Sequence, residues 1–160
     1  MDNTIYLQIS TVYEPAKDIR RCKIIELIKV KHDQFRTIKR EYVELDFAIV
    51  PEMSGFIDRF YDPVTNLEHY FISNLFRENV SIGLVRYAGS TIDDRVEGVI
   101  CKEVFVSSDG DSREFIVIET LVNDGFIIRT LHRWFGVTNV LLFVKEDRVE
   151  YDIGSQKWLN

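Results

Sequence analysis

The sequence has little of the chemistry that assigns a function by motif. Its 160 residues include two cysteines and three histidines, at Cys22, Cys101, His32, His69 and His132. Two cysteines are too few for a disulfide framework, so both are expected to be free thiols in a reducing compartment. The cysteines and histidines also lack the paired spacing of a zinc site, so we expect no bound metal.

Signatures of nucleotide binding and of membrane insertion are missing as well. The sequence has no P-loop and no G-x-G-x-x-G motif after a strand. The first ten residues, MDNTIYLQIS, lack the basic and apolar regions of a signal peptide, and no apolar run reaches the length of a membrane span. We therefore expect a soluble cytoplasmic protein that binds no cofactor and does not associate with membranes.

The charge balance argues against general nucleic-acid binding. Lys and Arg number 20 against 26 Asp and Glu, which gives a formal net charge of −6 spread over the chain. With 46% hydrophobic and 12% aromatic residues, the chain can fill one sizeable core. Residues 1–160 are therefore expected to form a single domain.

The stretch from Glu114 to Trp134 has the clearest pattern. Two apolar β-rich runs are joined by Asn123-Asp124-Gly125, which is typical of a hairpin loop with glycine at positive φ. Counting outward from this loop predicts three facing pairs: Leu121 with Ile127, Thr120 with Ile128, and Glu119 with Arg129. The ribbon is apolar on both sides, which predicts a strand pair covered on both faces and a Glu119–Arg129 pair shielded from water.

Three strands are expected before residue 51. Thr4 to Tyr13 alternates between apolar and polar residues, which predicts a half-buried strand. Ile19 to Lys31 fits either a helix opened by Pro15 or a strand. We favour the strand because three residues fall off the apolar stripe of that helix: Ile24, Ile25 and Ile28. Arg36 to Val50 alternates again, so the opening third is predicted to be a three-stranded meander.

The next segment has a helical period. Four apolar residues stand at i, i+3, i+4 and i+7, namely Met53, Phe56, Ile57 and Phe60, which predicts a short amphipathic helix. After Asp62-Pro63, helical spacing recurs at Val64, Leu67, Phe71, Ile72 and Leu75, and Thr65-x-x-Glu68 fits a capping box. The segment is therefore predicted to be an inserted two-helix hairpin.

Six more strands are expected, with a polar connection at residues 89–94: Val80 to Ala88, Val96 to Val106, Phe115 to Val122, Phe126 to Leu131, Val140 to Val144 and Val149 to Ile153. The last two are predicted to pair through Lys145 to Arg148 as a second hairpin. Three strands, two helices and six strands indicate an α+β fold, a predominantly antiparallel sheet or partly closed barrel of about nine strands.

Three residues are candidates for catalysis. Cys101, His132 and Glu119 would supply a thiol, a base and an orienting carboxylate if the fold brought them together. The competing interpretation makes Cys101 a core thiol and His132 a histidine at the rim of the sheet, because free cysteine is among the most buried residue types. Neither the spacing nor the neighbours of Cys101 indicate a nucleophile, so no catalytic residue is assigned.

Binding residues are predicted from composition. Tryptophan, arginine and neighbouring aromatic residues dominate interface hot spots, which selects five residues: His132, Arg133, Trp134, Phe135 and Trp158. The alternative is that both tryptophans plug the ends of the sheet. Basic residues from Lys29 to Arg40 fit an anion patch or a solvated sheet face.

Three functions are compatible with these patterns. The first is a non-catalytic acidic module that binds another protein, as an inhibitor, a neutralising protein or an accessory subunit. The second is a barrel-like carrier of an apolar small molecule. The third is an enzyme without a recognisable motif. An uncovered edge strand such as Thr4 to Tyr13 is also compatible with a homodimer.

Overall fold

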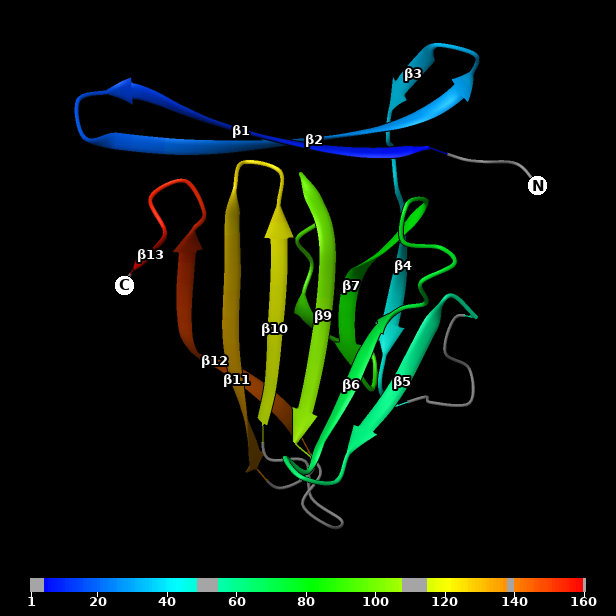
Figure 1. Cartoon of the computed structure of the whole chain (residues 1–160). Helices are drawn as coiled ribbons and strands as arrows, with labels where there is room; N and C mark the ends of the chain where they lie inside the picture. The colour runs from blue at the N-terminus through cyan, green and yellow to red at the C-terminus, as the bar shows by residue number, and fades with distance from the viewer. Residues whose placement is uncertain (1–4, 49–54, 108–114, 138–139, 160) are drawn as a thin grey trace.

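The computed structural model describes residues 5–48, 55–107, 115–137 and 140–159, and of residues 134–137, 140–144 and 146 it describes the backbone only. This part of the chain forms strands and contains no helix, so none of it is a helix long and apolar enough to cross a membrane. The strands make three sheets (Figure 1).

The first sheet is a meander of β1 (Tyr6–Ala16), β2 (Ile19–Lys31) and β3 (Gln34–Thr37). The second contains β4 (Glu41–Asp46), β7 (Val80–Tyr87) and β8 (Ser90–Asp93). The third has seven strands in the order β13 (Lys157–Leu159), β12 (Val140–Asp152), β11 (Phe126–Val137), β10 (Phe115–Val122), β9 (Val99–Ser107), β6 (Leu67–Ile72) and β5 (Ile57–Asp62).

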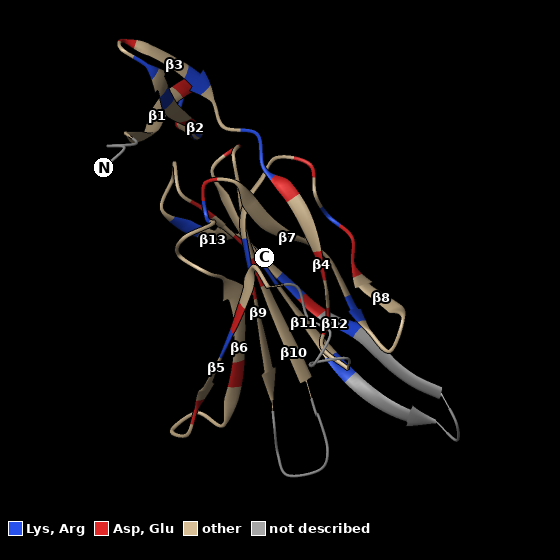
Figure 2. Ribbon diagram, turned by 90° about the vertical axis from the view of Figure 1, so that its right-hand side faces the viewer, with Lys and Arg blue, Asp and Glu red and all other residues tan. Residues whose placement is uncertain are grey.

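The main core lies between the seven-stranded sheet and the β4-β7-β8 sheet, which form two layers (Figure 2). Alternation along each strand supplies its inward side chains, as in β10, where every second residue is buried. The core residues include Leu45, Phe47, Tyr70, Ile82, Val104, Val106, Ile116 and Ile118, all at most 1% exposed. One side of the seven-stranded sheet is thereby covered.

The β1-β2-β3 sheet, which we call the arm, lies across the end of the seven-stranded sheet where the β10–β11 turn projects (Figure 1). The N–H of Ile24 donates to the carbonyl of Asn123 at 2.9 Å, and Cys22 and Ile24 pack against Ile100. Gly125 in this turn has φ 86°, and a Cβ there would stand 2.6 Å from the carbonyl oxygen of Cys22. The arm therefore rests on the turn through a contact that only glycine permits.

The predicted helix hairpin, and with it the α+β fold class, is wrong. Residues 57–62 and 67–72 are the antiparallel strands β5 and β6. The loop between them is held by Asp62, whose carboxylate accepts hydrogen bonds from the N–H of Val64 at 2.9 Å and the hydroxyl of Thr65 at 2.7 Å, while Asn66 takes φ 58°. The apolar residues of this segment follow a helical spacing over a few turns, but many of them are aromatic or β-branched, and such residues favour strands.

The hairpin predicted around Asn123-Asp124-Gly125 is confirmed as β10 and β11, with all three facing pairs in the expected register. The expectation that both faces are covered is wrong, because no layer formed by the described residues packs on the face opposite the core. Glu119 and Arg129 do form an ion pair at 2.9 Å, but their side chains are 26% and 44% exposed. The pair is therefore not shielded from water.

Other strand predictions also need correction. Ile19 to Lys31 is the strand β2, as favoured, but the preceding strand is exposed throughout rather than half-buried. The segment from Arg36 divides between two sheets, because β3 stays in the arm and β4 pairs in parallel with β7. Residues 90–93 of the predicted polar connection form β8.

The second predicted hairpin does not exist. Lys145 to Arg148 was expected to be a loop, yet β12 runs through these residues without a turn. Instead of folding back on itself, β12 pairs along its length with β11, with Val149 opposite Arg129 and Val144 opposite Arg133. The apolar alternation was correct for a strand, but alternation does not identify the neighbouring strand.

Candidate functional site

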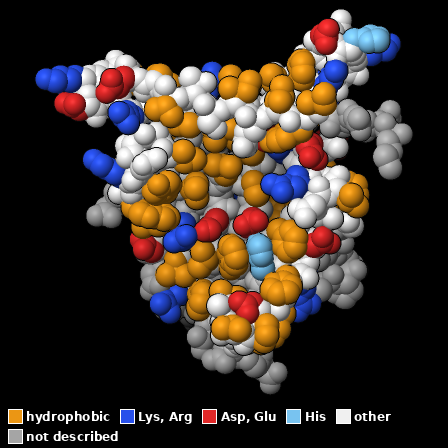
Figure 3. Space-filling model, viewed as in Figure 1, with side chains coloured by type: hydrophobic (Ala, Val, Ile, Leu, Met, Phe, Trp, Pro, Cys, Tyr) orange, Lys and Arg blue, Asp and Glu red, His pale blue; other side chains and the backbone are white. Residues whose placement is uncertain are grey.

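The part of the chain that the structure describes leaves one side of the seven-stranded sheet uncovered, and we call this side the open face (Figure 3). Facing pairs put side chains of five neighbouring strands, β6, β9, β10, β11 and β12, on this side, because residues paired across antiparallel strands point the same way. They are joined by residues of the two edge strands. The open face contains Phe60, His69, Phe71, Cys101, Glu103, Phe105, Phe115, Val117, Glu119, Leu121, Ile127, Arg129, Leu131, Arg133, Tyr151 and Trp158.

Aromatic side chains are prominent on the open face. His69 stacks on Phe105 with ring centroids 4.4 Å apart, and it also contacts Phe71 at 4.7 Å. At the other edge of the sheet, Trp158 packs on Tyr151 at 5.1 Å and lies under the Arg129 guanidinium at 4.9 Å. Phe60 and Trp158 remain 57% and 50% exposed. The open face is therefore an apolar surface in contact with solvent.

The arm overhangs one end of the open face, and a hollow of about 620 Å³, partly open to solvent, lies beneath it. The roof includes Tyr6, Gln8 and Glu26, and the floor includes Cys101, Glu119 and Leu121. The turn region after β6 closes one side with Arg77 and Glu78. The hollow thus has an apolar floor edged by carboxylates and a polar roof.

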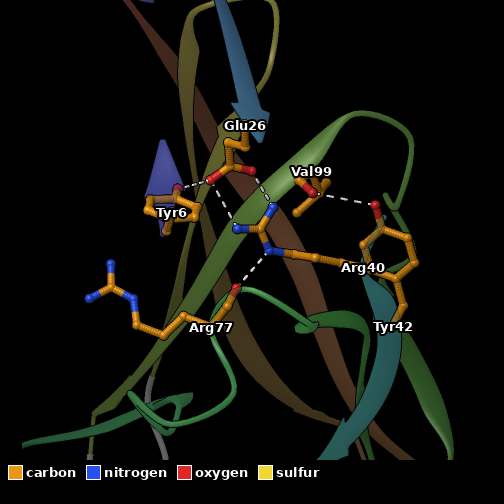
Figure 4. Close-up of polar contacts among 6 residues, drawn as sticks. All are labelled: Tyr6, Glu26, Arg40, Tyr42, Arg77 and Val99. Carbon is orange, nitrogen blue, oxygen red and sulfur yellow. Dashed lines mark hydrogen bonds and ion pairs between the residues drawn. The ribbon is translucent and has the colours of Figure 1, made fainter. Parts of the chain in front are cut away.

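A network of polar side chains holds the roof to the body (Figure 4). Arg40 donates to both carboxylate oxygens of Glu26, with Nη2 at 2.9 Å from Oε1, and its Nε donates to the backbone carbonyl of Arg77 at 2.7 Å. The Tyr6 hydroxyl donates to the same carboxylate. The Glu26 and Arg40 side chains are only 6% and 7% exposed. One buried ion pair therefore links the arm to the segment before β4 and to the turn after β6.

These contacts shift the ionisation of both acidic groups. Burial raises the pKa of Glu26, but hydrogen bonds from Arg40 and Tyr6 outweigh that effect and hold the pKa below its ordinary value. Burial and the adjacent Glu26 carboxylate raise the pKa of Tyr6 to about 12. At neutral pH the network therefore contains a carboxylate, a guanidinium and a neutral phenol.

Two carboxylates meet on the floor. Glu103 and Glu119 face each other directly across β9 and β10, an arrangement of like charges that is destabilising unless each finds a partner. Glu119 pairs with Arg129, and Glu103 lies 3.6 Å from Nε2 of His69. The Glu103 side chain remains 39% exposed. The floor consequently carries negative charge beside its apolar side chains.

The three catalytic candidates do not come together. Cys101 and Glu119 both line the hollow, whereas His132 points to the other side of the sheet, where it is 4% exposed and lies 3.1 Å from the Thr130 hydroxyl. Burial lowers the pKa of His132. Desolvation and the Glu103 carboxylate raise the pKa of the Cys101 thiol to about 11. A neutral thiol separated by the sheet from a buried imidazole is not an activated nucleophile.

The five predicted binding residues have different positions. Trp158 lies on the open face, Arg133 is an exposed residue of β11, and His132 is buried. The backbone of Trp134 and Phe135 is part of β11, and their side chains lie outside the described residues. Of this set, Trp158 and Arg133 lie on the side of the open face, because Arg133 pairs with Phe115 in register with Leu131 and Val117.

The sequence interpretation missed the roof. Arg40 was assigned to a basic patch or a solvated face, but it is buried against Glu26. The available signal was Glu26 itself, a single carboxylate inside the apolar run of β2. A lone charge in such a run requires a buried partner. Among the described residues no group of three or more His, Cys, Asp or Glu could hold a metal ion.

Comparisons with protein-family models, with curated proteins and with solved structures gave no match. The candidate site therefore depends on geometry alone.

Proposed function

We propose that this protein is a non-catalytic binding module that holds an apolar segment of another protein against its open face. The observation that carries the proposal is the uncovered side of the seven-stranded sheet, where Phe60 and Trp158 stay about half exposed on a surface rich in aromatic side chains. Monomeric soluble proteins rarely leave a contiguous apolar surface of this kind without an interaction to use it.

The charges on the open face favour a partner with basic residues beside its apolar segment. Glu103 and Glu119 stand in the middle of the apolar surface, and the chain has a net charge of −6. A basic rim on the partner would steer association and discriminate against acidic proteins. The ring stacking of His69 and Phe105 supplies a flat, rigid surface of the type that forms interface hot spots.

Photo-cross-linking from defined positions tests this proposal. Benzoylphenylalanine replaces Phe60 on the open face and, as the matched control, Val64 in the β5–β6 turn, which is 90% exposed. In extracts of the native host, we expect one protein to be captured from position 60 and not from position 64. Adding Trp158→Asp to the first variant should reduce that capture at least tenfold. Equal capture from both positions would contradict the proposal.

A small-molecule carrier is the second candidate, favoured by the hollow under the arm. Its volume of about 620 Å³ lies within the usual range of ligand pockets, and Leu121 and Ile127 give part of its lining an apolar character. Native mass spectrometry of gently purified protein would then detect a bound small molecule. Leu121→Trp, which fills the hollow, should abolish that added mass.

A further inference from the structure

The outer edge of the arm is an unpaired strand without charged residues. Among the described residues, β1 pairs only with β2. Residues 4–13 contain no Asp, Glu, Lys, Arg or His, although 29% of the whole chain is charged. Exposed edge strands are normally guarded by charged residues, proline or bulges, because their free backbone groups pair readily with another strand. From Tyr6 to Tyr13, β1 has none of these guards.

The direction of the backbone groups defines how a second strand can pair. The N–H of Lys29 donates to the carbonyl of Ile5 at 2.9 Å, so Ile5 directs its backbone groups toward β2. Because these directions alternate along a strand, the even-numbered residues direct theirs to the free edge. These residues are Tyr6, Gln8, Ser10 and Val12.

We propose that β1 of a second copy pairs antiparallel with this edge about a two-fold axis through Ile9. This centre is the one that pairs all four outward residues, Gln8 with Ser10 and Tyr6 with Val12, giving roughly eight backbone hydrogen bonds. The side chains on the outer surface also match, since Leu7 lies opposite Thr11 and Ile9 opposite its own copy. The two arms become one continuous sheet.

A second copy suits this edge because no like charges meet in the pairing. Two molecules with a net charge of −6 repel each other wherever carboxylates face one another, and residues 4–13 bring no charged side chain into the pairing. The outer surface of the arm adds apolar contact, because Leu7, Ile9 and Ile25 are 39%, 44% and 36% exposed. A closed two-fold dimer also removes an edge that would otherwise lead to open-ended association.

The same axis brings the two open faces opposite each other. A two-fold axis between antiparallel edge strands is perpendicular to the joined sheet, so both bodies lie on the same side of it. The arm overhangs the open face (Figures 1 and 2), and rotation about this axis turns the second open face toward the first. Ser10 and Val12 of the second copy then extend the roof beside Gln8 and Tyr6. The joined arms roof a cleft lined by both open faces.

Disulfide trapping tests the register in the full chain. The background carries Cys101→Ser, so that a cross-link can be assigned to the introduced cysteine, and the remaining Cys22 is buried. Ile9→Cys places two cysteines at the axis with Cα atoms about 4.5 Å apart, within the range of a disulfide. Leu7→Cys is the matched control, because its two copies stand roughly 13 Å apart. We expect covalent dimer from Ile9→Cys and less than a tenth as much from Leu7→Cys. Equal trapping would overturn the proposed pairing.

Sedimentation equilibrium tests the association itself. The unmodified chain is expected at about twice its mass of 18.8 kDa at micromolar concentration. Ile9→Lys, which opposes two lysines at the axis, should weaken the dimer at least tenfold, and Ser10→Pro, which removes an outward N–H, should do the same. Val30→Lys, at a 56% exposed site of β2, should leave it unchanged. A monomer at all concentrations up to about 100 µM, or a dimer insensitive to Ile9→Lys and Ser10→Pro, would overturn the proposal.

This dimer does not depend on the protein-binding function. A dimer that captures no partner from position 60 would contradict the proposed function and leave the dimer in place. A monomer that still captures a partner from position 60 would contradict the dimer and leave the proposed function in place.

Discussion

Arg40→Ala should destabilise the attachment of the arm by about 3 kcal/mol. The substitution leaves the Glu26 carboxylate, 6% exposed, without its bidentate partner. Removing one member of a buried ion pair costs about 3–5 kcal/mol. We take the lower end because the network borders the hollow, from which water can reach the carboxylate. For a chain of this size the melting temperature should fall by about 6–12 °C.

The pH dependence of this effect follows from the shifted pKa of Glu26. Its pKa in the folded protein is below the ordinary value, so the ion pair stabilises the fold above about pH 4.3, the pKa expected in the unfolded chain, and this contribution is lost as pH falls further. In Arg40→Ala, burial still raises the pKa of Glu26, and only the hydrogen bonds from Tyr6 and Gln8 oppose it, so this pKa is higher than in the unmodified protein. The stability difference between the two proteins should therefore narrow from pH 7 to pH 4.

Urea denaturation followed by circular dichroism at both pH values measures this difference. Arg77→Ala is the matched control, because Arg40 contacts only the backbone carbonyl of Arg77, which the substitution retains. Glu26→Gln combined with Arg40→Met removes both charges and should recover part of the lost stability. A loss below about 1 kcal/mol in Arg40→Ala, or an equal loss in Arg77→Ala, would refute the assigned role of the ion pair.

Three further predictions concern the core and the hollow. Gly125→Ala should lower the melting temperature more than Gly89→Ala. Both glycines have positive φ, so backbone strain costs about 1–2 kcal/mol in each variant, but only at Gly125 does the new Cβ also meet the arm. Equal melting temperatures of the two variants would disprove this contact. Lys102→Met should lower the free energy of unfolding, measured by urea denaturation, by about 3 kcal/mol, because the buried Nζ donates to the Asp93 carboxylate and to the backbone carbonyls of Gly83 and Arg95. An unchanged free energy of unfolding would contradict this prediction. In a Cys22→Ala chain, Cys101 should react with iodoacetamide at pH 8 roughly 200-fold more slowly than a free thiol, because its raised pKa leaves little thiolate. A rate within tenfold of that of a free thiol would exclude the raised pKa.

Local chemistry made several strands and one register predictable from the sequence. Asn123-Asp124-Gly125 fixes the hairpin loop, and with it the pairing of Glu119 with Arg129, because loop length and the positive φ of glycine leave little freedom in counting. The strand assignment of Ile19 to Lys31 followed from isoleucines that no helix could place on one face. The proposed dimer also depends on a property of the sequence, the uncharged stretch of residues 4–13.

Tertiary structure alone decided which surfaces are covered and which charges meet. The aromatic residues near Phe60 and Phe71 fit a helical spacing in a short window, and their pairing as β5 and β6 beside β9 made them strands. Whether a strand has one covered side or two depends on which layers pack on it, so the open face could not be inferred from apolar alternation. Glu26 and Arg40 are 14 residues apart in sequence, and the path of the chain from the arm into β4 brings them together. Binding surfaces and buried ion pairs arise from contacts between distant segments, which local patterns do not encode.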